Sequence, residues 1–440
     1  MVHTFKYGDD YFALDVESGS VHMLDRQGYD AITLVAEAER RGEDIEKAAE
    51  GTGLYGEIKE LIDEGLLFSG PDGDVKRPAN VLKAACLHLA HDCNLRCDYC
   101  FAKGGAFAGK RELMSADTAR AAIDFIAGIS GARRNIEIDF FGGEPMLNFE
   151  VLKKTVEYAR GIEKQRGKRF RFTVTTNAYR LTDEMKEYID GNMDNIVVSI
   201  DGRQHVHDAV RKNAGGSGSY ENVVANAKGL LLNRKGEYYI RGTYTADNLD
   251  FSRDVLHIAD MGFKGVSIEP VVTKGDKALK PEHLETIFAE YDTLAQEYEK
   301  RRKEGRGFTF FHFMVDLNAG PCLQKRIRGC GAGTEYVAIA PSGDVYPCHQ
   351  FVGKPEYRLG SVYNGKLNAD ISKAFDECNI FNIENCSKCW AKYYCSGGCA
   401  AANYNINGDI MKPYELGCAL QKKRLEIAIA IAAKEQAEET

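Results

Sequence analysis

Apolar residues in the first part of the chain follow the spacing of short helices and strands. Over 57–67 they recur every three or four positions, from Ile58 to Leu66, so they would share one face of a helix. The other elements expected here are two strands and two helices: 11–16, 20–24, 29–40 and 45–50. Strands followed by three short helices predict a winged-helix-like module over 1–75. The stretch 69–80, rich in Gly, Pro and charge, is expected to be a linker.

From residue 83 to about residue 303, apolar runs alternate with amphipathic stretches. The runs predict six strands: 84–90, 135–141, 171–176, 196–200, 238–245 and 265–270. Amphipathic helices lie between them, such as 117–129 with Ser115 as its expected N-cap. Repeated strand–helix units predict an α/β fold with a parallel sheet covered by helices. Six units are too few for a full eight-stranded barrel, so the sheet is open or forms a partial (β/α)6 barrel.

A long charged helix is expected at 281–303, after which the character of the chain changes. Residues 320–420 have little periodicity and are rich in Gly, Cys and Asn. Segments with so weak an apolar pattern usually depend on cross-links or bound metal. A final helix with Ala and Ile on one side is expected at 415–438. The chain is therefore predicted to have three domains: 1–75, 81–305 and 306–440.

Charge is distributed unevenly along the chain. The net charge is −8, but residues 1–75 hold 18 Asp and Glu against 6 Lys and Arg, which leaves the remainder near +4. Duplex DNA is bound largely through Lys and Arg, so an acidic module argues against nucleic acid as its partner. A winged module can instead bind an extended peptide along a strand edge. A small packing domain without a ligand is the alternative.

The chain also lacks the patterns of membrane insertion and export. No apolar stretch is long enough to span a bilayer, and the N-terminus does not have the basic-then-apolar layout of a signal peptide. We therefore expect a cytoplasmic protein. In that reducing compartment 13 clustered cysteines are expected to bind metal rather than to form disulfides.

Three of these cysteines form the sharpest motif, Cys93-x3-Cys97-x2-Cys100, directly after the first predicted strand of the α/β region. Three thiolates can hold three corners of a [4Fe–4S] cluster and leave the fourth iron open. A zinc site is the alternative, but it would need a fourth ligand at similar spacing, and His91 lies on the strand side of Cys93.

This motif, with Tyr99 before its last cysteine, resembles the signature of the radical S-adenosylmethionine (SAM) superfamily. The resemblance implies that the open iron binds SAM, and that reductive cleavage of SAM gives a 5′-deoxyadenosyl radical. It also implies cofactor-binding residues at the other strand ends. These are Tyr99, Gly142, Gly143, Glu144, Pro145, Thr176, Asn177, Ser199, Asp201, Arg211, Arg241 and Glu269. Each has an ordinary alternative as a turn, a loop cap or a surface charge. Their shared position supports the set, because ligands bind at the carboxyl ends of parallel strands.

The C-terminal cysteines resemble a second family pattern, the SPASM extension of radical SAM enzymes that modify peptides. The resemblance implies an outer auxiliary cluster held by Cys386, Cys389, Cys395 and Cys418. It implies an inner cluster held by Cys322, Cys330, Cys348 and Cys399. Cys322 is the weakest assignment, and without it the inner cluster would have an open iron. A zinc ribbon is the alternative for the part that contains the Cys386-x2-Cys389 motif. Cys86 and Cys378 match no motif.

The runs 320–335 and 346–351 resemble maturases of cysteine-rich SCIFF precursors, which install thioether crosslinks between cysteine sulfur and carbon. The implied partners are a Cys-rich precursor peptide bound through its leader and a reduced flavodoxin or ferredoxin-like electron donor. Together with SAM, three [4Fe–4S] clusters would be the cofactors. The substrate cysteine would meet the inner cluster as a thiolate, and His349 would either assist proton removal or be structural.

Two alternatives remain for the activity. Anaerobic sulfatase maturases oxidise Cys or Ser to formylglycine, and in them an Asp typically follows the cysteine of the Gly-x4-Cys motif. This chain has His349 at that position and an N-terminal module that those enzymes lack. A multi-cluster electron carrier is the non-enzymatic alternative, but a carrier has no use for a SAM-binding set. The sequence leaves open the peptide, the acceptor carbon, the number of crosslinks and the oligomeric state.

Overall fold

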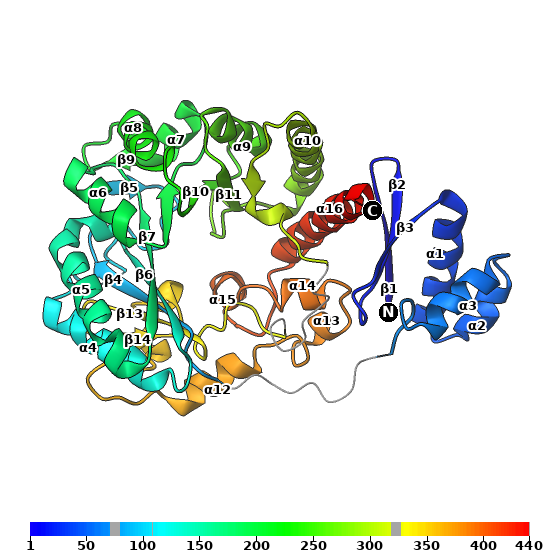
Figure 1. Cartoon of the computed structure of the whole chain (residues 1–440), viewed down its shortest axis with the longest axis horizontal. Helices are drawn as coiled ribbons and strands as arrows, with labels where there is room; N and C mark the ends of the chain where they lie inside the picture. Colours follow the sequence, from blue (N-terminus) through cyan, green and yellow to red (C-terminus); the bar gives the residue numbers. More distant parts are fainter. Residues whose placement is uncertain (71–79, 108, 318–326, 440) are drawn as a thin grey trace.

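The computed structural model describes residues 1–70, 80–107, 109–317 and 327–439. Residues 1–70, the N-terminal module, form a three-stranded antiparallel sheet in the order β1-β2-β3, followed by three helices (Figure 1). Its elements are β1 (Val2–Tyr7), β2 (Asp10–Asp15), β3 (Val21–Leu24), α1 (Arg26–Arg41), α2 (Ile45–Glu50) and α3 (Tyr55–Asp63). The strand β1 was not expected from the sequence. Most of the predicted linker lies outside the described residues.

Local side chains explain where these elements begin and end. The Asp25 carboxylate accepts a hydrogen bond from the Gly28 amide at the start of α1, and Gly42, with φ of 74°, ends that helix. In the turn between β2 and β3, the buried Asp15 carboxylate accepts hydrogen bonds from the Ser18 amide and hydroxyl. The strands and helices therefore follow the order that the sequence predicts, with β1 added at one edge.

The second part of the molecule is built on a ten-stranded sheet, in the order β12-β11-β10-β8-β7-β6-β4-β13-β14-β15. Neighbours from β12 to β13 are parallel, and the strands from β13 to β15 are antiparallel. Its parallel strands are β4 (Ala84–Ala90), β6 (Asn135–Gly142), β7 (Arg169–Thr176), β8 (Asn195–Ser199), β10 (Glu237–Tyr244), β11 (Gly265–Pro270), β12 (Thr309–Phe310) and β13 (Tyr336–Ile339). The predicted α/β fold is confirmed, and all six predicted strands are present.

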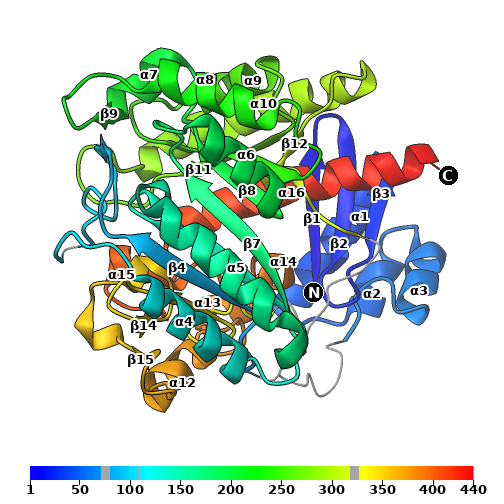
Figure 2. The ribbon, with the colours of Figure 1, turned by 60° about the vertical axis from the view of Figure 1, so that its left-hand side comes forward.

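Helices cover the convex face of this curved sheet (Figures 1 and 2). They are α4 (Ala116–Ile129), α5 (Phe149–Arg166), α6 (Asp183–Asn192), α7 (Gln204–Val210), α8 (Tyr220–Leu231), α9 (Phe251–Asp260) and α10 (Leu284–Lys303). The predicted N-cap of α4 is confirmed, because the Ser115 hydroxyl accepts a hydrogen bond from the Thr118 amide at 3.0 Å. A separate two-stranded sheet pairs β5 (Leu95–Cys97) with β9 (Arg211–Asn213).

The C-terminal part extends the ten-stranded sheet and then becomes helical. Its remaining elements are β14 (Asp344–Tyr346), β15 (Gly360–Ser361), α12 (Ala369–Glu377), α13 (Glu384–Ser387), α14 (Lys392–Cys395), α15 (Ala400–Asn407) and α16 (Glu415–Glu439). Short 3-10 helices are η1 (Pro145–Asn148), η2 (Pro281–His283), η3 (Phe311–Phe313), η4 (His349–Phe351) and η5 (Pro355–Tyr357). No helix in the described residues is both long enough and apolar enough to cross a membrane.

Alternation along the strands gives the ten-stranded sheet two different faces. Apolar, fully buried residues such as Phe140, Phe172 and Ile240 point toward the helices. The positions between them point the other way and carry polar side chains, including Asp139 and Arg241. We call this second surface the inner face. It faces the C-terminal cysteine-rich part, because the ring of Phe141 on β6 lies 5.0 Å from that of His349.

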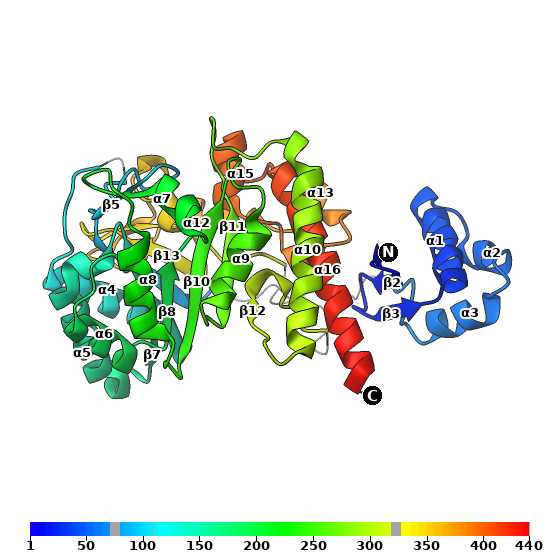
Figure 3. The same ribbon diagram turned by 90° about the horizontal axis from the view of Figure 1, so that it is seen from above.

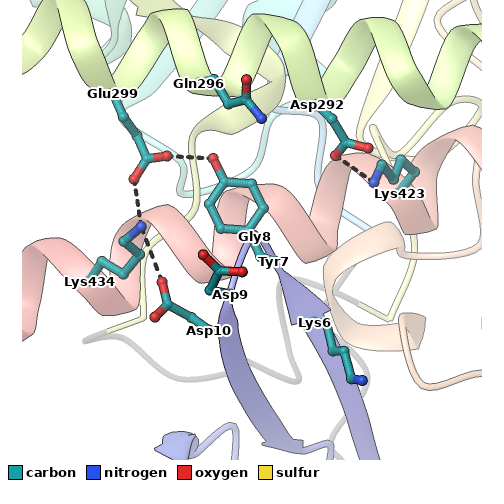
Figure 4. A pocket seen from close by; sticks show the side chains of 10 residues that line it. All are labelled: Lys6, Tyr7, Gly8, Asp9, Asp10, Asp292, Gln296, Glu299, Lys423 and Lys434. Carbon is teal, nitrogen blue, oxygen red and sulfur yellow. Dashed lines mark hydrogen bonds and ion pairs between the residues drawn. The ribbon is translucent and has the colours of Figure 1, made fainter.

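The N-terminal module packs against the C-terminal helix α16 (Figure 3). At the tip of its β1–β2 hairpin, the Tyr7 hydroxyl donates to Glu299 of α10 at 2.5 Å. Lys434 of α16 lies 3.1 Å from Glu299 and 3.3 Å from Asp10 (Figure 4). These groups border a cleft of about 570 Å³ between the hairpin, α10 and α16. The cleft has mixed charge, and its acids and lysines largely pair with one another across the junction.

Candidate functional site

The cysteine triplet lies at the carboxyl end of the parallel strands. The strand register of β5 and β9 places Cys97 directly opposite Arg211. The Cys93 sulfur accepts hydrogen bonds from the Leu95 amide at 3.4 Å and from the Asn177 side-chain amide at 3.6 Å. Burial raises the pKa of the Cys93 thiol to about 12 and that of the Cys97 thiol to about 11.

Such thiols ionise at neutral pH only when a cation stabilises the sulfur. Because N–H groups also point at Cys93, the donor set fits an iron–sulfur cluster better than a free nucleophile. The three predicted cluster ligands, Cys93, Cys97 and Cys100, all lie in the segment that follows β4, and Cys97 is the last residue of β5.

Asp201, after β8, joins two of the predicted cofactor residues. Its fully buried carboxylate accepts hydrogen bonds from the Tyr99 hydroxyl at 2.7 Å and from the Arg211 guanidinium at 2.9 and 3.1 Å. It also accepts one from the Thr243 amide. Tyr99, Asp201 and Arg211 are thus brought together as expected, but the carboxylate is fully occupied by protein donors. Asp201 therefore acts as an anchor that positions Arg211 and the cluster loop.

Close backbone contacts leave no room for a side chain at the two glycines at the end of β6, Gly142 and Gly143. A Cβ atom on Gly142 would lie 2.3 Å from the Ala90 carbonyl oxygen, and φ there is +127°. A Cβ atom on Gly143 would lie 2.2 Å from the Asp92 carbonyl oxygen. The turn is bonded to the cluster loop, because the Glu144 amide donates to Asp92 at 2.9 Å. Glycine at both positions therefore allows the strand end to approach the cysteine loop.

Glu144 is 2% exposed and lies beside this turn. One oxygen accepts from the Met146 amide and the Thr176 hydroxyl, and the other accepts from the Asn177 amide at 2.8 Å. Burial raises the pKa of Glu144 to about 7, although these hydrogen bonds oppose the shift. The second oxygen retains an acceptor position, which suits a ligand ammonium group. Pro145, the next residue, opens η1 and is buried.

The remaining predicted cofactor residues lie on the inner face. Ser199 on β8 is in register with Arg241 on β10, and Glu269 lies at the end of the adjacent strand β11. The sequence analysis did not identify two partners of the Glu269 carboxylate. His312 Nε2 lies 3.4 Å from this carboxylate and Arg424 Nη1 lies 3.7 Å from it. They come from η3 and α16, more than 40 and 150 positions away, so no motif could connect them.

Several C-terminal cysteine thiols lie near enough to raise one another's pKa values. Burial raises the pKa of Cys348, and the nearby thiols of Cys399 and Cys330 add to the effect. Burial likewise raises the pKa of Cys395 to about 11, with Cys418 and Cys389 adding to it. In the described ranges no three Cys, His, Asp or Glu side chains stand close enough to hold one single metal ion. A four-iron cluster is larger than one ion, so its ligands stand farther apart.

We call Cys330, Cys348 and Cys399 the inner cysteine group, and Cys386, Cys389, Cys395 and Cys418 the outer cysteine group. Cys322, the fourth predicted ligand of the inner cluster, lies outside the described residues. Cys378 matches no motif, yet it packs in the same hydrophobic cluster as Cys348 and donates its thiol hydrogen to the Ile410 carbonyl at 3.2 Å. Cys86 is buried on β4.

His349 packs among aromatic rings rather than in a polar pocket. Its ring centroid lies 5.5 Å from that of Phe101 and 5.0 Å from that of Phe141. Its Nδ1 is 3.4 Å from the Tyr336 hydroxyl. Burial lowers the pKa of His349 to about 4, and the charge of Arg241 adds to this effect. Such an imidazole is a weak proton acceptor near neutral pH, so the environment favours the structural alternative for this residue.

Two family models match the chain. Residues 87–236 match the Radical SAM superfamily, and residues 330–390 match SPASM, an iron–sulfur cluster-binding domain. The chain therefore carries a radical SAM domain followed by a SPASM domain. The first match spans the cysteine triplet, the Gly-Gly-Glu-Pro turn and Arg211. The second begins at Cys330 and ends just after Cys389.

The curated relatives include maturases. The chain is 23% identical over 359 residues to the radical SAM cyclopropyl synthase TigE of Paramaledivibacter caminithermalis, covering 78% of this chain and 72% of TigE. It is 25% identical over 337 residues to the cysteine-type anaerobic sulfatase-maturating enzyme of Clostridium novyi, covering 70% of this chain and 85% of that enzyme.

Solved structures share the fold. The structure of anSMEcpe with bound AdoMet has a TM-score of 0.70 at 19% identity, covering 81% of this chain and 96% of that one. Streptococcus suis SuiB bound to the precursor peptide SuiA has a TM-score of 0.53 at 14% identity, covering 92% of this chain and 96% of SuiB. A match over 92% of the chain must extend into the N-terminal module, whereas a match over 81% need not.

Proposed function

We propose that this chain is a radical SAM peptide maturase that forms intramolecular thioether crosslinks, from cysteine sulfur to carbon, in a ribosomally made Cys-rich precursor peptide. SAM and three [4Fe–4S] clusters, one at the triplet and one at each C-terminal cysteine group, are its cofactors. When bound, SAM and the triplet cluster supply the 5′-deoxyadenosyl radical. A reduced flavodoxin or ferredoxin-like protein is the proposed electron donor.

The chain's own residues suit this cofactor. The free acceptor position on Glu144 would receive the SAM ammonium group, and the missing side chains at Gly142 and Gly143 keep the turn close to the cluster loop. Arg211 uses two of its N–H groups on Asp201, which leaves others for the SAM carboxylate. Ser199, Thr176 and Asn177 supply polar groups at neighbouring strand ends.

The free edge of β3 is the observation that most directly supports a peptide substrate. Among the described strands β3 pairs only with β2, so its other edge can pair with an added strand. Met23 on β3 is 45% exposed and Leu66, after α3, is 36% exposed, and the His22 ring contacts the Leu66 carbonyl at 3.0 Å. An extended leader could place its backbone along β3 and apolar side chains against Met23 and Leu66.

The electron balance of the reaction requires an acceptor. A C–H and an S–H bond are broken and one C–S bond forms, so two hydrogens leave the peptide. One leaves as a hydrogen atom to give 5′-deoxyadenosine, the other leaves as a proton, and one electron remains. A cluster held by Cys330, Cys348 and Cys399 would supply the electron acceptor that this balance needs. The ring contact of 5.0 Å between Phe141, which precedes the Gly-Gly turn, and His349, which follows Cys348, supports this assignment.

Formylglycine formation is a second candidate, because the chain is 25% identical to a sulfatase-maturating enzyme. Two features oppose it. The residue after Cys348 is His349, which packs against Phe101 and Phe141 with a lowered pKa, where the maturases resembled have an Asp. The chain also has an N-terminal module, which the maturases resembled lack.

The test is anaerobic incubation of reconstituted protein with SAM, reductant and the small Cys-rich peptide encoded beside the gene. Mass spectrometry would show loss of two hydrogens per crosslink, with an equal loss of alkylatable thiols. A new aldehyde that reacts with a hydrazide would instead establish formylglycine. SAM cleavage with every thiol still alkylatable would refute crosslinking and point to another radical modification.

A further inference from the structure

Arg241 presents a charged side chain on the inner face of the sheet. Its neighbours on β10, Ile240 and Gly242, are buried on the opposite side, and Gly242 lies against Ile268 of β11. Strand alternation therefore directs Arg241 away from the helices. The residue is exposed, in contrast to the apolar positions before and after it.

In the described part of the chain, no hydrogen bond or ion pair engages the Arg241 guanidinium, although an acidic residue is close. Glu269 lies on β11, two positions after Ser267, which is in register with Arg241, and it is already shared by His312 at 3.4 Å and Arg424 at 3.7 Å. Arg424 also donates to Nδ1 of His312 at 2.9 Å, which places the imidazole proton on Nε2, toward Glu269. This acid on the adjacent strand thus has two other partners.

The charge of Arg241 reaches groups on four other elements. It opposes the effect of burial on Asp139 of β6, whose pKa is raised to about 7, and it helps to lower the pKa of Glu269. It also adds to burial in lowering the pKa values of His312 and His349 to about 4.

The strand register places Arg241 beside Ser199 on the inner face, which is the side of the sheet that faces the cysteine-rich part through the contact between Phe141 and His349. The local charge there is positive. Arg241 and Arg424 are cations, Glu269 is the one ionised acid that they share, and His312 is neutral at neutral pH because its pKa is low. A cation without a partner at such a site gains most from a ligand carboxylate, which it can bind through two N–H groups.

We propose that Arg241 binds a carboxylate of the peptide substrate, an Asp or Glu side chain close to the residue that is modified. This inference rests on the proposed function. It differs from the expectation that Arg241 contacts SAM, and the experiment below separates the two assignments. The enzyme is thus expected to prefer precursor peptides with an acidic residue beside the crosslinked position.

The test compares Arg241→Gln, Arg241→Lys and a matched control, Arg253→Gln, whose side chain is 73% exposed on α9. Anaerobic holoenzyme would be used with the peptide encoded beside the gene and with variants in which each Asp or Glu is replaced singly by its amide. We would measure KM and kcat for the peptide, the Kd of SAM, and SAM cleavage without peptide.

For Arg241→Gln we expect the peptide KM to rise about 10- to 100-fold, with SAM affinity and peptide-free SAM cleavage unchanged. With wild-type enzyme, one of the amide-substituted peptides should show the same rise in KM. With Arg241→Gln, that peptide should show no further rise, because the two substitutions remove the same contact. Arg241→Lys should restore part of the loss, and Arg253→Gln should match wild type.

Two outcomes would overturn the inference. A rise in the Kd of SAM with an unchanged peptide KM would assign Arg241 to the cofactor. Peptide and SAM constants within twofold of wild type would leave the residue without a binding role. If wild-type enzyme leaves the peptide unmodified, the proposed function fails separately. The affinities of wild type and Arg241→Gln for a leaderless peptide and its amide variants then decide the inference.

Discussion

Glu17 and Lys392, which are 375 residues apart in the chain, form an ion pair of 2.6 Å in which less than a tenth of either side chain is exposed. The Tyr393 hydroxyl donates to the other oxygen of Glu17 at 2.9 Å. Nearby, the His3 ring stacks on Trp390 with centroids 3.9 Å apart and planes 4° apart. These contacts hold the N-terminal module against the segment that carries the outer cysteine group.

Lys392→Met tests this junction. The substitution leaves the Glu17 carboxylate buried without its cation, which typically costs about 3–5 kcal/mol. We expect faster hydrogen–deuterium exchange in β1, β2 and β3 and a lower crosslinking rate. As a control, Lys373→Met removes a side chain that is 74% exposed and should change stability by less than about 0.5 kcal/mol. Unchanged exchange in Lys392→Met would show that the pair does not hold the module.

Gly143→Ala tests the contact between the Gly-Gly turn and the cluster loop. The new Cβ atom would lie 2.2 Å from the Asp92 carbonyl oxygen, so one of the two segments must move. We expect weaker SAM binding by at least about tenfold and less iron retained after reconstitution. The measurements are SAM affinity by equilibrium dialysis and iron per chain.

A matched control is Gly161→Ala, in the middle of α5, where a Cβ atom would meet nothing within 4 Å. Replacing a helical glycine by alanine should stabilise the protein by about 0.5–1 kcal/mol and leave SAM binding unchanged. Equal SAM affinity in the two variants would contradict the role assigned to the Gly-Gly turn.

Asp139 should make stability depend on pH. Its pKa is about 7 in the folded protein, raised by burial, and 3.8 when unperturbed. Between about pH 4 and 7 the folded state keeps a proton that the unfolded state releases, so stability falls as pH rises through this range and levels off above it. Asp139→Asn removes this effect, so its stability relative to wild type should increase from pH 5.5 to 7.5.

Urea unfolding at several pH values would measure this difference. Asp183→Asn, on a fully exposed side chain, is the control and should follow the wild-type pH dependence. A constant difference between Asp139→Asn and wild type across the range would be inconsistent with a raised pKa at this position.

The inner cysteine group can be tested by iron content. Cys399→Ala should lower iron by about four atoms per chain, because the cluster proposed for this group would lose a ligand. Cys378→Ala should keep full iron, since its thiol donates to the Ile410 carbonyl and matches no motif. Mössbauer spectra would count the clusters in each variant. Loss of a cluster in Cys378→Ala would make Cys378 a ligand in place of Cys322.

The strands of the large sheet were predictable because parallel strands covered by helices are apolar on the helix side over most of their length. The predicted strand 135–141 is β6, Asn135–Gly142, and the predicted 265–270 is β11. The strand β1 escaped prediction because Val2, Phe5 and Tyr7 do not alternate regularly. Its strand conformation depends on pairing with β2 and on packing against α16.

The sequence alone determined the elements whose chemistry is local. Cys93, Cys97 and Cys100 can reach one cluster because three and two residues separate them, and the Gly-Gly turn follows directly from a predicted strand. The tertiary structure alone decided which distant groups meet: Asp201 with Arg211 and Tyr99, Glu17 with Lys392, and Glu269 with His312 and Arg424. The physical reason is that these partnerships depend on strand order and helix packing, and no spacing along the chain encodes which side chains a folded sheet brings within hydrogen-bonding distance.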